Sequence, residues 1–205
     1  GSIIAVTAPH YRPEEGPGSA GKRLGRVVVY KFDDTRDAWD KEGKPLIGLD
    51  GESFGSSLGM SEDGRSIIVG SIAKNEKGDE KAGKVQVFVL DTATGEPEWI
   101  QKGQTLYGEF AHDLFGFDVD IRDGGEVIAI GAPGKDVDTL EEAGTVSIYK
   151  WISADGKWTI VNHSRDNDRS VLKGEEARGH YGASVSLSQV GVLAVGEPDA
   201  NNGGK

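Results

Sequence analysis

The chain of 205 residues contains no cysteine, so it has neither a disulfide framework nor a thiol for nucleophilic or redox chemistry. No apolar run approaches the roughly 20 residues that a membrane-spanning helix requires. Basic residues are also few, because 23 Lys and Arg stand against 34 Asp and Glu and give a formal net charge of −11. Nucleic acids and anionic membranes attract basic patches, so we expect no nucleic-acid partner and no membrane insertion by this segment.

The sequence also lacks the short motifs of the common catalytic and metal-binding classes. It has no Gly-x-Ser-x-Gly stretch and no glycine-rich phosphate loop. The four histidines, at positions 10, 112, 163 and 180, do not show the His-x-x-x-His spacing of a zinc site. A carboxylate pair stays open, because 34 acidic residues offer many pairs and no spacing selects one. We therefore expect a protein that is not an enzyme.

Glycine, by contrast, is abundant, with 31 residues, and part of it belongs to a long internal repeat. An aromatic residue followed by glycine occurs at Phe54, Phe115 and Tyr181, so that successive copies are 61 and 66 residues apart. Nearly the same spacing separates three tryptophans and four glycines: Trp39, Trp99 and Trp158, and Gly25, Gly83, Gly144 and Gly204. A period this long, filled with short strands, is typical of a propeller or another repeat array.

Each full copy of the repeat is predicted to contain four short strands separated by Asp-Gly and similar turn signals. In the third copy we expect strands over residues 115–121, 126–130 and 145–151, and a fourth that begins at Lys157. In the first of these, Phe117, Val119 and Ile121 would share one face. The first copy lacks its opening strand and the last copy stops after its second, which gives three, four, four and two strands.

The fold class that follows is all-β: a β-propeller, or a propeller segment, of consecutive four-stranded antiparallel blades. We expect blades at residues 1–53 (partial), 54–114, 115–180 and 181–205 (partial). Such a set leaves apolar blade faces open, so the chain is predicted to be a fragment of a longer propeller. Its partners would then include further blades of the same chain or another copy. A β-solenoid or a row of separate sheets is the alternative.

Two short motifs recur in register along the chain. Phe54-Gly55, Phe115-Gly116 and Tyr181-Gly182 begin the blades, and Gly131-Ala132-Pro133 ends a second strand. These motifs resemble the FG-GAP repeat of the integrin α-subunit head, in its calcium-less variety. The resemblance spans essentially the whole chain. It implies a propeller that is extracellular or in the cell surface or envelope, with a role in protein binding or cell adhesion.

Many integrin blades carry a calcium loop, Asp-x-Asp-x-Asp-Gly-x-x-Asp, between their first two strands. The matching turns at residues 61–65 and 188–191 are short and poor in carboxylates. Only the segment with Asp118, Asp120 and Asp123 comes close, and it has one residue too many. Calcium requires six to eight converging oxygens. We therefore expect no metal and no cofactor, and these three aspartates would be the ligands if calcium bound.

Long acidic loops are the candidate binding surface. In an up-and-down sheet, the loop after the second strand and the loop after the fourth strand emerge on the same rim, and long loops on a rigid scaffold often bind partners. The rim residues that we expect to bind are Asp136, Asp138, Glu141, Glu142, His112, Asp113 and His180. The histidines have an alternative role as caps of backbone groups, and the charged loops have an alternative role in solubility alone.

These observations predict a non-enzymatic interaction, adhesion or structural module that binds a protein or a glycan through its loop rim, as part of a larger surface or assembly protein. The alternative is a catalytic propeller, such as a glycan-active hydrolase or lyase, with carboxylates contributed by several blades. Asn162, in the triplet Asn162-His163-Ser164, is a further candidate site for a glycan if the chain is secreted.

Overall fold

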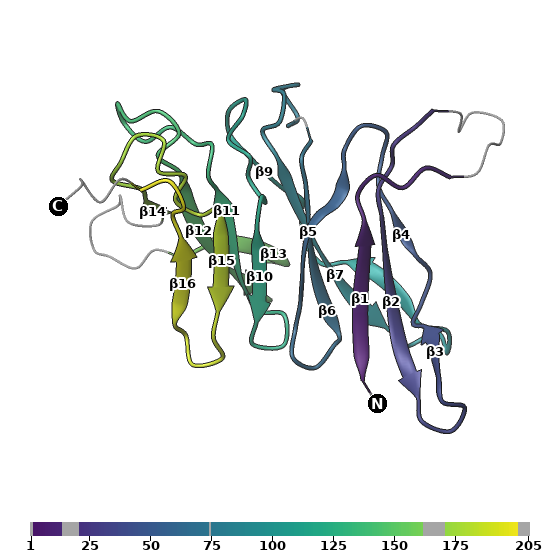
Figure 1. Cartoon of the computed structure of the whole chain (residues 1–205). Helices are drawn as coiled ribbons and strands as arrows, with labels where there is room; N and C mark the ends of the chain where they lie inside the picture. Colours follow the sequence, from purple (N-terminus) through teal and green to yellow (C-terminus); the bar gives the residue numbers. More distant parts are fainter. Residues whose placement is uncertain (1, 14–20, 74, 162–170, 201–205) are drawn as a thin grey trace.

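The computed structural model describes residues 2–13, 21–73, 75–161 and 171–200, which form four antiparallel β-sheets arranged side by side in a fan (Figure 1). These residues contain no helix, and hence none that is long and apolar enough to cross a membrane. The sheets follow one another in chain order, and we number them blades 1 to 4. The prediction of an all-β fold built from antiparallel propeller blades is confirmed.

Each blade is a meander in which consecutive strands pair. Blade 1 consists of β1 (Ile3–Ala8), β2 (Arg26–Asp33), β3 (Ala38–Lys41) and β4 (Leu46–Ile47). Blade 2 consists of β5 (Phe54–Met60), β6 (Ser66–Ser71), β7 (Lys84–Asp91), β8 (Glu98–Gln101) and β9 (Leu106–Tyr107). Blade 3 consists of β10 (Val119–Arg122), β11 (Val127–Ala132), β12 (Thr145–Ile152), β13 (Lys157–Ile160) and β14 (Val171–Lys173). Blade 4 consists of β15 (Ser184–Leu187) and β16 (Leu193–Gly196).

The outermost strand of blades 1, 2 and 3 is broken into two pieces. In blade 2, β8 pairs with the second half of β7, whereas β9 pairs with the beginning of β7. Blades 1 and 3 repeat this arrangement with β3 and β4 and with β13 and β14. The sequence predicted one outer strand per blade and missed the second piece, because a strand of two or three residues is too short to show an alternating pattern.

The first strand of blade 3 is shorter than predicted. It begins at Val119 rather than Phe115, and Phe117, which was expected on the buried face, is 44% exposed. The cause is Gly116, whose φ of 85° bends the chain so that the Phe117 amide donates to the carbonyl of Leu114. In blade 2 the same position forms a β-bulge within β5.

The repeated glycines lie where one blade touches the next. Gly83, just before β7, has a φ of 87°, and a Cβ atom there would lie 2.1 Å from the carbonyl oxygen of Phe115. Gly25 approaches Phe54 and Gly144 approaches Tyr181 in the same way. The lone glycine and the aromatic-glycine pair of the repeat are therefore the two sides of one junction, where the close approach of two backbones requires glycine.

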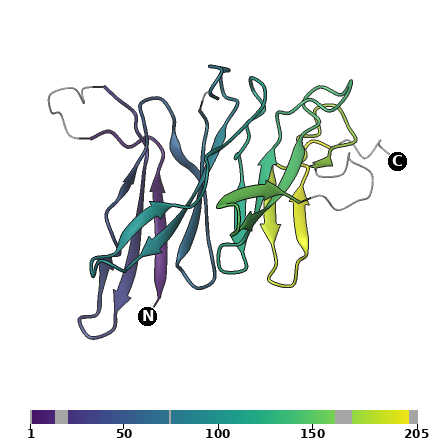
Figure 2. The ribbon, with the colours of Figure 1, turned by 180° about the vertical axis from the view of Figure 1, so that it is seen from behind.

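The core lies between the blades, and two tryptophans fix its outer part. Trp99 and Trp158 are 6% and 3% exposed, and each extends from the outer strand of its blade toward the preceding blade. The indole Nε1 of Trp99 donates to the carbonyl of Glu42 at 2.8 Å, and that of Trp158 donates to the carbonyl of Lys102 at 2.9 Å. The view from behind shows the outer hairpins that carry them, in teal and green (Figure 2). Each junction thus has the same contact at the same register.

Candidate functional site

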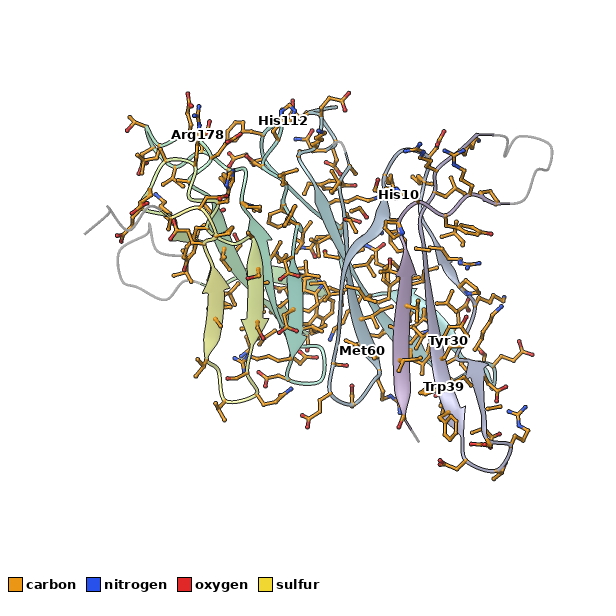
Figure 3. The ribbon with its side chains drawn as sticks, viewed as in Figure 1. His10, Tyr30, Trp39, Met60, His112 and Arg178 are labelled. Atoms are coloured by element: carbon orange, nitrogen blue, oxygen red, sulfur yellow. The ribbon has the colours of Figure 1, made fainter. Side chains whose placement is uncertain are left out.

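Three loops of blades 2, 3 and 4 meet at the upper rim of the molecule and enclose a hollow of about 650 Å³. They are the loops at residues 108–114, 134–142 and 174–180. Figure 3 shows His112 and Arg178, from two of these loops, on the same side of the molecule. We call this hollow the rim pocket. Its lining residues are Phe110, Ala111, His112, Asp113, Gly134, Asp136, Asp138, Glu141, Glu142 and Arg178.

The loop at residues 134–142 is a small rigid hairpin. Val137 and Leu140 exchange two backbone hydrogen bonds of 3.0 and 2.8 Å, and Asp138 turns the chain with a φ of 55°. The Asp136 carboxylate accepts a hydrogen bond from the Glu142 amide at 2.8 Å and so ties the two ends of the loop together. Val137 is 6% exposed and anchors the hairpin to the blade. The acidic side chains of this loop are therefore held on an ordered backbone.

The loop at residues 108–114 is fixed by a buried carboxylate. Asp113 accepts hydrogen bonds from the amides of Glu109 and Phe110 at 3.1 and 3.0 Å, and its side chain is 5% exposed. Lys135 from the neighbouring hairpin lies 3.4 Å from Asp113 and 2.9 Å from Glu109. Its ammonium group also lies 5.2 Å from the centre of the Phe110 ring, a cation–π distance. Asp113 thus positions the loop, and Phe110, 57% exposed, presents an aromatic surface to the pocket.

The loop at residues 174–180 adds a guanidinium group and an imidazole. Arg178 pairs with Glu141 at 3.2 Å, and both side chains are largely exposed. Outside the lining of the pocket, the His180 Nδ1 lies 2.8 Å from a carboxylate oxygen of Asp199, and its Nε2 lies 3.6 Å from Glu142. The imidazole therefore lies between two carboxylates, one of which faces the pocket. This arrangement can hold a ring in a fixed orientation and pass a proton toward Glu142.

The left-handed backbone of these loops has a structural origin. His112 and Arg178 have positive φ angles of 66° and 59°, and so does Gly51 at the equivalent place before blade 2, at 79°. Leu114 and His180 likewise match Ser53. Because the conformation recurs before every blade, it belongs to the turn that enters a blade, and it is no sign of strain stored for catalysis.

The structure brings most of the predicted rim residues together. Asp136, Asp138, Glu141, Glu142, His112 and Asp113 line the pocket, and His180 lies beside it. Sequence reasoning missed three contributors: Phe110, Arg178 and Asp199. Phe110 and Arg178 lie in loops that the sequence placed on the rim, so an aromatic and a basic side chain among acids was the available signal. No pattern in the sequence indicated the contact between Asp199 and His180.

The three aspartates considered for calcium serve other purposes. Asp118 and Asp120 accept hydrogen bonds of 2.7 and 2.6 Å from the amides of Val185 and Leu187, and so connect the inner strands of blades 3 and 4. Asp123 pairs with the neighbouring Arg122 at 2.8 Å. Among the described residues no group of three or more potential ligands converges on one point. The residues present here do not fit the calcium loop of the FG-GAP family. Asn162 lies outside the described residues.

Buried groups around the pocket are few. Burial raises the pKa of the Tyr181 hydroxyl, at the start of blade 4, and the nearby Glu197 carboxylate raises it further. Five carboxylates, an imidazole and a guanidinium group line the rim pocket itself, together with one exposed aromatic ring. Such a set can donate and accept protons and can bind the hydroxyl groups of a ligand.

No protein-family model matches this chain, and no curated protein matches it. Among solved structures it is similar to the periplasmic gluconolactonase PpgL of Pseudomonas aeruginosa, with 16% sequence identity and a TM-score of 0.48. The match covers 98% of this chain and 48% of that one. The chain therefore spans about half the length of the protein it resembles.

These comparisons correct the expected function. The similar structure is, by its title, an enzyme, and this contradicts the prediction of a non-enzymatic interaction or adhesion module. It favours the alternative of a catalytic propeller. The β-propeller assignment is supported, whereas no family model supports the FG-GAP or integrin resemblance. That protein is periplasmic, which agrees with an envelope location; a cell-surface or extracellular location stays a prediction.

Proposed function

We propose that this chain belongs to a catalytic β-propeller that hydrolyses a carbohydrate substrate, and that the rim pocket is its active site. The observation that carries the proposal is the pocket itself, where carboxylates, an imidazole and a guanidinium group from three different loops surround one hollow. Its volume of about 650 Å³ is within the range of small-molecule sites. Residues far apart in sequence therefore meet where a ligand of a few sugar units fits.

The pocket supplies the groups that hydrolysis needs. A carboxylate of the hairpin at residues 134–142 acts as general base and takes a proton from the attacking water, whose oxygen bonds to the substrate carbon. A second acidic group, or the His112 imidazole, gives a proton to the departing oxygen, so that the bond breaks without leaving a free alkoxide. Arg178, at the mouth, stabilises negative charge that develops on a substrate oxygen.

Two features favour a carbohydrate over an apolar substrate. Phe110 exposes 57% of its surface in the pocket wall, and the face of an aromatic ring packs well against the C–H face of a sugar. The rest of the lining is rich in carboxylate oxygens, which accept hydrogen bonds from sugar hydroxyls. A partner in the form of a glycan, one of the predictions from the sequence, is thereby proposed as the substrate.

The test is turnover of a panel of sugar lactones and aryl glycosides by the purified chain. We expect hydrolysis of at least one member, and a fall in kcat of about 10²–10⁴-fold in Asp138→Asn or Glu142→Gln, the size expected when one acid–base group is lost. Asp155→Asn is the matched control, because Asp155 lies in the exposed turn between β12 and β13, outside the pocket lining. Absence of turnover on the whole panel, or equal activity of both pocket variants and the control, contradicts the proposal.

A further inference from the structure

The side of blade 1 that faces away from blade 2 has the same design as two buried surfaces of the molecule. We call the side of a blade that faces the preceding blade its leading face. In blade 2 the leading face contains Ile67, Val69, Phe88 and Trp99, which pack against Val27 and Val29 of blade 1. In blade 3 it contains Ile128, Ile130, Tyr149 and Trp158, which pack against Val85 and Val87 of blade 2. In blade 1 the equivalent residues are Ile4, Val6, Tyr30 and Trp39.

The strand registers show that these residues are equivalent. Ile4 pairs with Tyr30 across β1 and β2, as Ile67 pairs with Phe88 and Ile128 pairs with Tyr149 in the next blades. On the outer hairpins, Trp39 pairs with Phe32, as Trp99 pairs with Leu90 and Trp158 pairs with Trp151. The same pleat and the same residue types therefore recur on all three leading faces.

Exposure distinguishes the three faces. Ile67 and Val69 are completely buried, as are Ile128 and Ile130. Ile4 and Val6, in contrast, are 40% and 49% exposed, and Trp39 is 43% exposed. Figure 3 shows Tyr30 and Trp39 on blade 1, at the side of the fan opposite to blade 4. An apolar surface whose equivalents are buried at two junctions is thus open at the third.

The two formed junctions specify what this face would accept. At each junction the tryptophan Nε1 donates to the main-chain carbonyl one residue beyond the outer strand of the preceding blade. A left-handed glycine follows that carbonyl, Gly43 or Gly103, and its Cα lies against the indole ring. No such contact involves Trp39 in the described part of the chain. The matching partner therefore offers a valine-lined sheet face, a free carbonyl and a glycine after its outer strand.

We propose that the leading face of blade 1 is the docking surface for one further β-blade of the same repeat, with Trp39 as its hydrogen-bonding anchor. The edge of β1 supports the same occupant. In blades 2 and 3 the equivalents of β1, which are β6 and β11, pair with an inner strand, β5 or β10, whereas in the described structure β1 pairs with β2 alone. A docked blade thus comes with an inner strand that pairs with β1, and both unmet requirements of blade 1 are satisfied together.

The experiment supplies such a blade from the chain itself. A copy of residues 54–126 is placed ahead of Ile3, which adds a duplicate of blade 2 followed by a duplicate of β10 and its turn. Ile3 stands at the repeat position of Val127, so the natural turn before β11 is kept. The readouts are hydrogen exchange of the Trp39 indole N–H, assigned with Trp39→Phe, and thermal melting of serine variants.

In the extended chain we expect exchange of the Trp39 indole to slow to that of Trp99 and Trp158. Trp39→Ser should then lower Tm about as much as Trp99→Ser does, whereas in the original chain Trp39→Ser should have a much smaller effect than Trp99→Ser. Fast exchange of Trp39 in a folded extended chain overturns the proposal. So does a dimer of the original chain, in sedimentation, that Trp39→Ser abolishes, because the face would then bind a second copy.

Discussion

At the scale of single residues, Gly83 and Gly95 have nearly the same backbone conformation in very different surroundings. Their φ angles are 87° and 88°, but a Cβ on Gly83 would lie 2.1 Å from the Phe115 carbonyl oxygen, whereas one on Gly95 would meet nothing within 4 Å. The two positions therefore separate the cost of a left-handed backbone from the cost of a steric clash.

We expect Gly95→Ala to destabilise the protein by about 1 kcal/mol, from backbone strain alone. Gly83→Ala should cost a further ~1–3 kcal/mol, because the backbone of Phe115 must move to make room. Urea unfolding of the two variants measures the difference. Equal loss of stability in both would show that the junction between blades 2 and 3 yields without cost.

The sequence identified Gly83 and its equivalents as landmarks, because they recur at a constant spacing. It did not reveal why glycine is required there. The reason is a contact between backbones about 30 residues apart, Gly83 with Phe115, and a contact of that kind depends on how two blades pack. The same limit explains Phe117, whose place on the buried face followed from alternation but was changed by the bend at Gly116.

At the scale of elements, the hairpin of β2 and β3 is closed by a charged turn. The Asp33 carboxylate accepts hydrogen bonds from the Thr35 hydroxyl at 2.5 Å, from the Arg36 guanidinium at 2.7 Å and from the Thr35 amide at 2.8 Å. The Thr35 hydroxyl is the largest cause, followed by Arg36, of a pKa for Asp33 well below its ordinary value of 3.8. The charged form of Asp33 is therefore the one that the folded turn prefers.

The sign of the pH effect follows from this shift. A carboxyl whose pKa is lowered by folding adds stability above its unfolded pKa and loses that contribution as the pH falls toward the folded value. We expect Asp33→Asn to lower Tm at pH 7 and to have a smaller effect at pH values well below 3.8. Thermal melts of both proteins between pH 7 and pH 2 measure the difference in Tm. A difference that stays constant over this range contradicts the assigned role.

Elements were predicted well where a pattern is long enough to read. The second and third strands of blades 2 and 3, such as β6 and β11, were expected within a few residues of where they lie, because runs of Ile and Val buried on both faces are distinctive. The short pieces β4, β9 and β14 were missed, since the hydrogen bonds that define them depend on β2, β7 and β12 already being in place.

At the scale of the whole molecule, the net charge of −11 sets the response to ions. Screening of repulsion among acidic groups stabilises the folded chain, so Tm should rise modestly as salt increases. Because Asp118, Asp120 and Asp123 do not converge, CaCl₂ should raise Tm no more than NaCl at equal ionic strength, and a chelator should leave Tm unchanged. Calorimetry in matched salts is the measurement. An extra rise of several degrees in calcium would reveal a site.

The sequence by itself determined the class of fold, the order of the blades and the rim on which the acidic loops lie, because each rests on local patterns that repeat. Its functional prediction was wrong in denying catalysis, because no motif marks a site assembled from three loops. Only the tertiary structure placed Phe110 and Arg178 in one pocket with the hairpin acids, put Asp199 against His180, and left Trp39 exposed while Trp99 and Trp158 are buried. Identical local patterns meet different neighbours in each blade, and those neighbours are set by packing between segments distant in the chain.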